Sequence, residues 1–177
     1  MTSPLPRLTL VLGGARSGKS RYGEQLITST PSPWTYIATA EARDDEMRSR
    51  IDTHITRRGT GWTTREVPLA LTQAINDVQP ATPVLVDCLT LWLSNIMLAD
   101  LNVDKERASL CAALEAAAGP LVLISNEVGL GIVPETPLGR EFRDAQGRLN
   151  AEVAAIADHV VFLAAGLPLV LKPRSTP

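Results

Sequence analysis

The chain has 177 residues, of which 45% are hydrophobic, so it is long and apolar enough for one domain with a full-sized core. A formal net charge of −2 argues against a nucleic-acid partner that requires a broad basic face. Cys88 and Cys111 lack metal-ligand spacing and no apolar run is long enough to span a membrane, which favours a reduced, cytoplasmic protein. We expect a single domain over residues 1–177, with residues 1–7 as a short N-terminal extension and residues 173–177 as a C-terminal tail.

The first predicted strand and the first predicted helix enclose a glycine-rich loop. Residues 8–12 form an apolar run, residues 21–28 can be helical, and residues 13–20 between them read Gly-Gly-Ala-Arg-Ser-Gly-Lys-Ser. This is the pattern of a phosphate-binding loop in the strand–turn–helix context that the motif requires. We predict that an exposed Lys19 contacts the β- and γ-phosphates of a nucleoside triphosphate and that Ser20 binds Mg²⁺. The alternative is a tight turn with a chance lysine.

Apolar strands alternate with helical segments along the rest of the chain. Pro68 stands where a helix can begin, and Asp104 is expected to cap another helix. Uninterrupted apolar strands separated by helices predict an α/β fold with a largely parallel sheet covered on both faces. The further strands are expected over residues 34–39, 63–67, 83–87, 121–125, 159–163 and 167–171, and the further helices over residues 44–58, 68–78, 89–98, 104–118 and 142–156.

Ligands of such sheets gather at the carboxyl ends of the strands. Asp87 ends one predicted strand and matches the second acidic element of P-loop NTPases, which holds Mg²⁺; the alternative is an N-cap for the helix that begins near Leu89. Glu127 follows another strand as a weaker candidate to bind metal or orient water, and its alternative is a solvated loop carboxylate. His159 begins an apolar run, so we expect it to be structural.

The predicted helix over residues 44–58 carries a histidine among arginines. At about 100° per residue, Arg50, His54, Arg57 and Arg58 share roughly a third of the helix circumference. Neighbouring guanidinium groups disfavour the imidazolium form, so the ring should be neutral and nucleophilic, while the arginines hold phosphates. The alternative is a solvated helix face on which the histidine has no role.

An ordered set of motifs extends far beyond the glycine-rich loop. With it, the chain resembles the bifunctional adenosylcobinamide kinase/adenosylcobinamide-phosphate guanylyltransferases of cobalamin biosynthesis over residues 8–172. The motifs are Gly-Gly-Ala-Arg-Ser-Gly-Lys-Ser-Arg at 13–21, Tyr-Ile-Ala-Thr at 36–39, Asp-Glu-Met at 45–47, Arg-Ile-x-x-His at 50–54, Trp-x-x-x-Glu at 62–66, Val-Asp-Cys-Leu-Thr at 86–90, Asn-Glu-Val-Gly at 126–129, Gly-Ile-Val-Pro-Glu at 131–135, Phe-Arg-Asp at 142–144 and Gly-Arg-x-Asn at 147–150.

The resemblance implies a P-loop NTPase with a RecA-like sheet, an antiparallel C-terminal strand and a homotrimeric assembly. It implies that ATP or GTP phosphorylates the aminopropanol hydroxyl of adenosylcobinamide. GMP is then passed from GTP, through a covalent GMP–histidine, to give adenosylcobinamide-GDP. His54 matches the nucleophile, with Lys19 catalytic and Ser20 and Asp87 holding Mg²⁺. The implied nucleotide-binding residues are Gly13, Gly14, Ala15, Arg16, Ser17, Gly18, Lys19, Ser20, Ala38, Thr39, Ala40, Ile55, Thr56, Arg57, Arg58, Glu66 and Asp87.

Three other classes of protein fit the sequence less well. A regulatory GTPase is disfavoured because no lysine follows an asparagine, so the base-reading Asn-Lys-x-Asp sequence is missing. The acidic balance and short chain disfavour a RecA-like ATPase that acts on DNA. A small-molecule kinase without transferase activity is the closest alternative, and His54 is the residue that separates it from a bifunctional enzyme.

Overall fold

The computed structural model describes residues 5–41 and 59–173. The predicted helix over residues 44–58 lies outside the described residues, and so do Arg50, His54 and residues 55–58.

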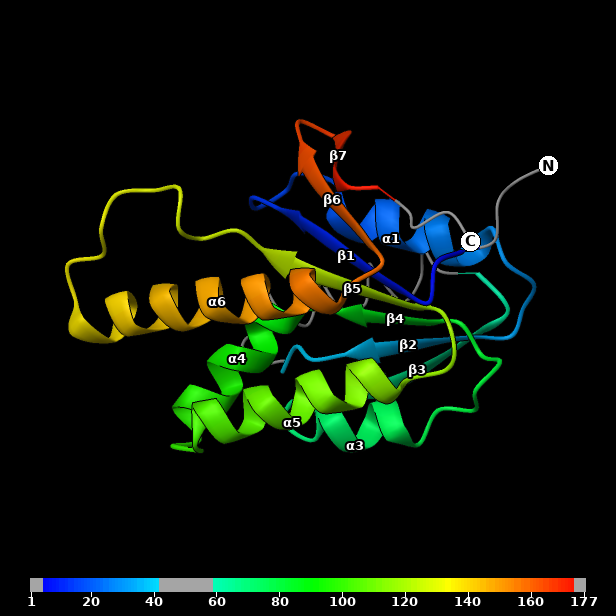
Figure 1. The fold of residues 1–177 in the computed structure, drawn as a ribbon, viewed down its shortest axis with the longest axis horizontal. Helices are drawn as coiled ribbons and strands as arrows, with labels where there is room; N and C mark the ends of the chain where they lie inside the picture. The colour runs from blue at the N-terminus through cyan, green and yellow to red at the C-terminus, as the bar shows by residue number, and fades with distance from the viewer. Residues whose placement is uncertain (1–4, 42–58, 174–177) are drawn as a thin grey trace.

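The described residues form one seven-stranded sheet in the order β3-β2-β4-β5-β1-β6-β7 (Figure 1). All neighbours pair in parallel except β6 and β7, which are antiparallel. The expected mostly parallel α/β sheet with an antiparallel C-terminal strand is therefore confirmed. The strands are β1 (Leu8–Gly13), β2 (Trp34–Ala38), β3 (Trp62–Glu66), β4 (Val84–Asp87), β5 (Leu121–Asn126), β6 (His159–Ala164) and β7 (Leu167–Lys172).

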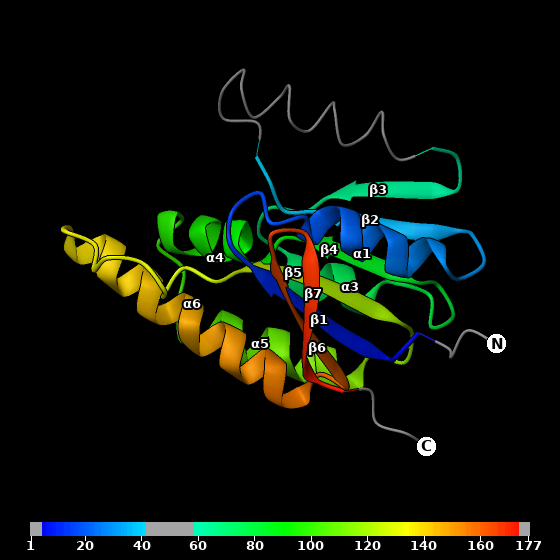
Figure 2. The ribbon, with the colours of Figure 1, turned by 90° about the horizontal axis from the view of Figure 1, so that it is seen from above.

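Helices cover the two faces of the sheet unequally, as Figures 1 and 2 show. One face carries α1, whose Ile27 packs into a small core with Val11 and Leu85. The opposite face carries the other four helices of the described residues and the larger core, which includes the fully buried Trp92. Burial of this apolar surface is the main force that holds the layers together. The helices are α1 (Lys19–Thr28), α3 (Leu71–Asn76), α4 (Leu89–Leu98), α5 (Val103–Ala116) and α6 (Pro137–Ile156).

Four helix starts differ from the sequence-based expectation. Helix α1 begins at Lys19 rather than at Arg21. The N-cap of α5 is Asn102, whose side chain accepts the Lys105 N–H at 2.9 Å, so the prediction that Asp104 caps this helix is wrong. Asp104 lies in the first turn, where its charge suits the helix dipole. Helix α3 begins at Leu71 rather than at Pro68. Helix α6 begins earlier than expected, at Pro137, because Thr136 caps it by accepting the Gly139 N–H at 3.1 Å.

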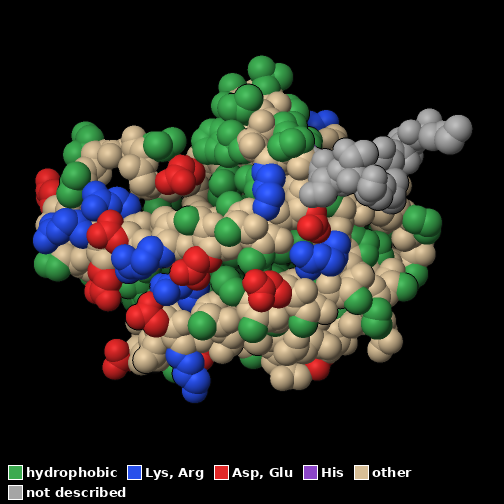
Figure 3. Space-filling model, viewed as in Figure 1, with side chains coloured by type: hydrophobic (Ala, Val, Ile, Leu, Met, Phe, Trp, Pro, Cys, Tyr) green, Lys and Arg blue, Asp and Glu red, His purple; other side chains and the backbone are tan. Residues whose placement is uncertain are grey.

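The last strand leaves apolar side chains uncovered. β7 pairs only with β6 among the described strands, and Leu167, Leu169, Val170 and Leu171 are each more than half exposed. Figure 3 shows hydrophobic side chains gathered at the top of the molecule, where Figure 1 places β6 and β7. The connection from β5 to α6 swings away from the body of the molecule and carries the almost fully exposed Ile132. In the part of the chain that the structure describes, no helix is long and apolar enough to cross a membrane.

Candidate active site

The glycine-rich loop connects β1 to α1 and depends on its first glycine. Gly13 has φ +153°, and a Cβ there would lie 2.5 Å from the Leu163 carbonyl oxygen and 2.7 Å from Ser17 Oγ. Gly18 has φ +97° and is the N-cap of α1. Both backbones occupy conformations that L side chains rarely adopt. The loop therefore wraps tightly at the carboxyl end of β1.

The N-terminus of α1 is open to an anion. No side chain caps this helix, and its first turn contains no acidic residue. The first N–H groups of a helix have no intrahelical acceptor, and the helix dipole adds partial positive charge at the same place. These features together suit the binding of a phosphate group, and Ser20 lies in the first helical turn beside them.

Lys19 is buried within the loop rather than exposed, so the expectation of an exposed lysine is wrong. Its side chain is folded back so that Nζ donates to the Gly14 carbonyl oxygen at 2.6 Å, and only 7% of the residue is exposed. Burial lowers the pKa of Lys19, and the neighbouring Cys88 and Asp87 act in the opposite direction. A partly desolvated ammonium interacts strongly with a nearby phosphate, because little water screens it.

Asp87 ends β4, and its charge opposes the lowering of the Lys19 pKa. Its Oδ2 accepts the Tyr36 hydroxyl at 3.0 Å. The N-cap of α4 is Cys88, with no side-chain capping bond, so the alternative interpretation of Asp87 as the cap is wrong. Burial, and next the charge of Asp87, raise the pKa of Cys88 to about 12, so its thiol stays protonated. The Asp87 carboxylate thus remains available to a ligand.

The residues at this end of the sheet fit a phosphate-bound Mg²⁺. Among the described residues no cluster of three or more His, Cys, Asp or Glu side chains could form a metal cage. Mg²⁺ bound to nucleotide phosphates needs no cage, since it keeps several waters and takes one or two protein oxygens. The half-buried Asp87 carboxylate and the Ser20 hydroxyl are donors of the required kind.

The parallel register brings three predicted nucleotide-binding residues into one row. Ala38 at the end of β2 pairs with Glu66 of β3 on one side and with Asp87 of β4 on the other. Glu66 is exposed, and Ala40 is half-buried two residues beyond the end of β2. The carboxyl edge of the sheet therefore carries this row next to the glycine-rich loop.

Thr39 directly follows Ala38 of this row, and its hydrogen bonds connect the end of β2 to β4 and α4. Its hydroxyl donates to the Cys88 carbonyl oxygen at 2.7 Å and accepts the Cys88 N–H at 2.8 Å. Its own N–H donates to the Asp87 carbonyl oxygen at 3.1 Å, and its carbonyl oxygen accepts Asn95 Nδ2 at 2.9 Å. Thr39 therefore ties the end of β2 to the residue that follows Asp87, a role that its sequence position did not reveal.

Glu127 connects the end of β5 to the glycine-rich loop. Its N–H donates to the Gly13 carbonyl oxygen at 3.1 Å, and its Oε1 accepts the Gly129 N–H at 2.6 Å. One carboxylate oxygen is thus engaged within its own loop, and the residue is half-buried. His159 lies at the other end of the sheet, buried, with Nδ1 2.9 Å from the Lys172 carbonyl oxygen, which agrees with a structural role.

A buried polar cluster beneath the end of β5 escaped the sequence analysis. It consists of Thr90, Ser125, Gln146 and Asn150, which are linked by hydrogen bonds. Gln146 and Asn150 stand one helical turn apart on α6, on the side that also carries Leu149 and Val153. Two amides on an apolar helix face are the sequence signal that could have indicated this cluster.

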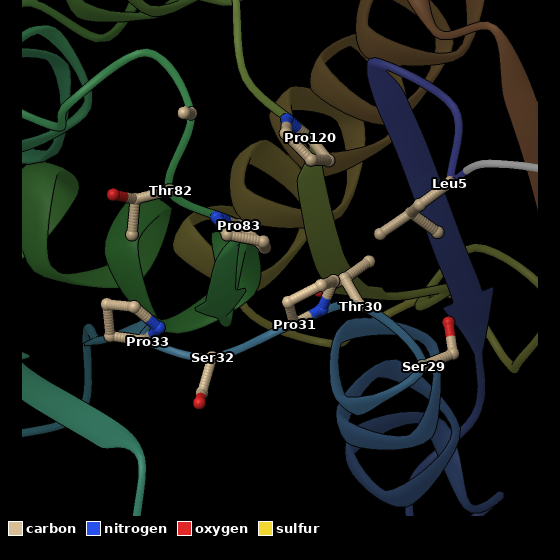
Figure 4. Close-up of a pocket in the computed structure, with 10 residues that line it drawn as sticks. Leu5, Ser29, Thr30, Pro31, Ser32, Pro33, Thr82, Pro83 and Pro120 are labelled. Atoms are coloured by element: carbon tan, nitrogen blue, oxygen red, sulfur yellow. The ribbon is translucent and has the colours of Figure 1, made fainter.

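A hollow of about 560 Å³ opens at the opposite edge of the sheet (Figure 4). Four of its ten lining residues are prolines, among them Pro33, Pro83 and Pro120, which precede β2, β4 and β5. None of its lining side chains is ionisable. This hollow lies at the amino ends of the strands, so it is separate from the candidate active site.

A match to a known protein family identifies the family of this chain. Residues 9–171 match the family described as cobinamide kinase / cobinamide phosphate guanyltransferase. The chain belongs to this family. Its expected resemblance to these enzymes is confirmed.

Individual relatives of the cobinamide kinase / cobinamide phosphate guanyltransferase family match almost end to end. The bifunctional adenosylcobalamin biosynthesis protein CobP of Pseudomonas aeruginosa is 45% identical over 166 residues, covering 92% of this chain and 96% of the relative. The bifunctional adenosylcobalamin biosynthesis protein CobU of Salmonella typhimurium is 39% identical over 181 residues, covering 93% of this chain and 99% of the relative.

Solved structures at lower identity support the fold of the family member described here. The flagellar accessory protein FlaH of Methanocaldococcus jannaschii has a TM-score of 0.54 at 13% identity, over 97% of this chain and 80% of that chain. A prototypical ATPase from the type III secretion system of pathogenic bacteria has a TM-score of 0.53 at 16% identity, over 91% of this chain and 53% of that chain. These likenesses show the fold alone, a mostly parallel sheet with packed helices.

Proposed function

We propose that this chain phosphorylates the aminopropanol hydroxyl of adenosylcobinamide with ATP or GTP and then transfers GMP from GTP to the new phosphate, giving adenosylcobinamide-GDP. The observation that carries the proposal is membership of a family described by both reactions, over residues 9–171. The same observation favours the bifunctional enzyme over a kinase without transferase activity.

The kinase step uses the carboxyl edge of the sheet. The glycine-rich loop and the open N-terminus of α1 bind the β- and γ-phosphates, and the phosphates replace the Gly14 carbonyl oxygen as the partner of Lys19 Nζ. Ser20 and Asp87 hold Mg²⁺, which neutralises phosphate charge when bound. Catalysis of this kind is mainly positioning and electrostatic stabilisation, because the loop has little covalent chemistry to perform.

The transferase step uses His54, which lies outside the described residues. A neutral imidazole nitrogen attacks the α-phosphorus of GTP, a P–N bond forms, and the P–O bond to pyrophosphate breaks. A phosphate oxygen of adenosylcobinamide phosphate then attacks the same phosphorus and releases the histidine. Arg57 and Arg58 would bind the departing pyrophosphate, and Ile55, Thr56, Glu66 and residues 38–40 would contact the nucleotide, as the resemblance implies.

Labelling with GTP that carries ³²P at the α-position tests this function. The wild-type protein, incubated with Mg²⁺, should retain a label that is lost in acid and stable in base, as a phosphoramidate requires. His54→Ala should take up no label and make no adenosylcobinamide-GDP, yet still phosphorylate adenosylcobinamide. Thr53→Ala is the matched control, since it changes the adjacent side chain and keeps the nucleophile. Acid-labile label on the His54→Ala protein would show that another residue is the nucleophile. A wild-type protein that takes up no label would leave kinase activity as the function that the protein retains.

We also infer a cytoplasmic homotrimer. The exposed apolar side chains of β7 support an assembly, because β7 is an edge strand of the described sheet and an edge strand with such a surface favours association in solution. A cytoplasmic location would supply ATP and GTP to both reactions. Sedimentation equilibrium should give three times the 19.0 kDa mass of one chain, and a monomer would contradict the assembly.

A further inference from the structure

Four polar side chains form a cluster inside an otherwise apolar core, on the sheet face that carries α4 and α6. Thr90 is 7% exposed, Asn150 is 5% exposed, and Ser125 and Gln146 are fully buried. They come from α4, β5 and α6, so three separate elements meet at this point. A buried polar cluster of this kind is costly unless its members are paired, so its hydrogen bonds decide what it does.

The hydrogen bonds of the cluster converge on the end of β5. The Ser125 hydroxyl donates to Asn150 Oδ1 at 2.6 Å. Gln146 Nε2 donates to Ser125 Oγ and to Asn150 Oδ1, both at 2.9 Å. The Asn150 amide is held by these two bonds and is thereby oriented toward β5.

The main chain of Asn126 is clamped from two sides. Its carbonyl oxygen accepts Asn150 Nδ2 of α6 at 3.1 Å, and its N–H donates to Thr90 Oγ1 of α4 at 2.8 Å. Asn126 is in register with Gly13, and the N–H of the next residue, Glu127, donates to the Gly13 carbonyl oxygen at 3.1 Å. The cluster is thus two hydrogen bonds away from the start of the phosphate loop.

A shift of β5 would move Gly13 as well, because Gly13 is packed against β6 on the side away from β5. A single added Cβ there would lie 2.5 Å from the Leu163 carbonyl oxygen of β6. The start of the loop is therefore packed between β5 and β6. A change in the position of Asn126 on β5 would change the position of the phosphate loop. Replacing both partners of a buried hydrogen bond by apolar groups of the same shape is nearly neutral for stability, whereas removing one partner leaves the other unpaired at a cost of about 1–3 kcal/mol.

We infer that Gln146 and Asn150 are positioning residues for phosphoryl transfer, acting through Asn126 and Glu127 on the phosphate loop. This inference rests on the proposed kinase function of that loop. The side chains of Gln146 and Asn150 act without contacting the nucleotide. Their effect is on the placement of the phosphates relative to the acceptor hydroxyl, and a misplacement near 1 Å can cost about a hundredfold in rate.

Two apolar variants of similar volume test the inference, Gln146→Leu and Asn150→Leu. Thr9→Val is the matched control, because Thr9 is also fully buried, its Oγ1 has no hydrogen-bond partner among the described residues, and it lies at the far end of β1. Ser125→Ala serves as a milder variant if the leucine variants fail to fold. The measurements are kcat and KM for ATP with adenosylcobinamide, the slow transfer from ATP to water, and thermal melting.

We expect kcat per folded molecule to fall about tenfold to a hundredfold in the cluster variants, with KM for ATP within about twofold of wild type. Each leucine variant leaves buried polar partners unpaired, so its melting temperature should fall, and the rates are measured well below that temperature. Thr9→Val should keep wild-type kcat. Folded cluster variants with wild-type kcat would overturn the inference, as would a loss of kcat that only follows a loss of folded protein. A wild-type protein that transfers the phosphoryl group of ATP to water but never to adenosylcobinamide would refute the proposed function. The positioning role would still be tested in that case, by comparing the rates of transfer to water between the variants and the wild type.

Discussion

Replacing Gly13 by alanine should damage the phosphate loop more than any other single methyl group added to it. The new Cβ would meet the Leu163 carbonyl oxygen at 2.5 Å and Ser17 Oγ at 2.7 Å, and Leu163 cannot retreat because it pairs with Gly13 in the sheet. Overpacking costs about 1–3 kcal/mol and the backbone conformation about 1–3 kcal/mol, offset by about 0.4–1 kcal/mol from a less flexible unfolded chain. The middle of each range gives a net loss of about 3 kcal/mol, or about 6–12 °C in melting temperature for a chain of this length.

Gly14→Ala is the matched control, one residue further along the same loop. A Cβ at Gly14 meets nothing within 4 Å, so this variant should melt within about 2 °C of wild type. Circular dichroism melts and urea unfolding of both variants measure the difference, and nucleotide binding measures its consequence for the site. Equal melting temperatures for Gly13→Ala and Gly14→Ala would refute the reasoning, because the clashes with Leu163 and Ser17 and the positive φ belong to Gly13 and not to Gly14.

Four further substitutions have expected outcomes. Lys19→Met should abolish phosphorylation of adenosylcobinamide while the melting temperature stays the same or rises, since burial of the ammonium disfavours its charge; undiminished turnover would exclude this loop as the kinase site. Asp87→Asn should lose activity at ordinary Mg²⁺ with little change in melting, because the Tyr36 hydroxyl can still donate to the amide oxygen; full activity would end the metal role. Asn102→Ala should lower the unfolding free energy by about 1 kcal/mol in urea titrations, whereas Asp104→Ala should cost less, and the reverse order would restore Asp104 as the cap.

Local patterns were sufficient for much of this fold. The boundaries of α4 were predicted to the residue, because Leu89–Leu98 is an apolar run that begins directly after a strand. The loop at residues 13–20 could be predicted as a phosphate site because its chemistry resides in the main chain and in adjacent residues. The start of α5 was missed because two side chains, Asn102 and Asp104, can both cap a helix, and only the backbone conformation at Asn102 decides between them.

The sequence by itself determined the alternation of strands and helices, the phosphate loop and the family, since each depends on residues that are neighbours in the chain. The tertiary structure alone decided that Lys19 is buried, that Asp87 accepts the hydroxyl of Tyr36 rather than capping α4, and that Asn150 holds the end of β5. Tyr36 and Asp87 are 51 residues apart, and Asn126 and Asn150 are 24 apart. Such pairs meet only when parallel strands place their carboxyl ends at one edge and the helices pack across them, so no local pattern can specify them.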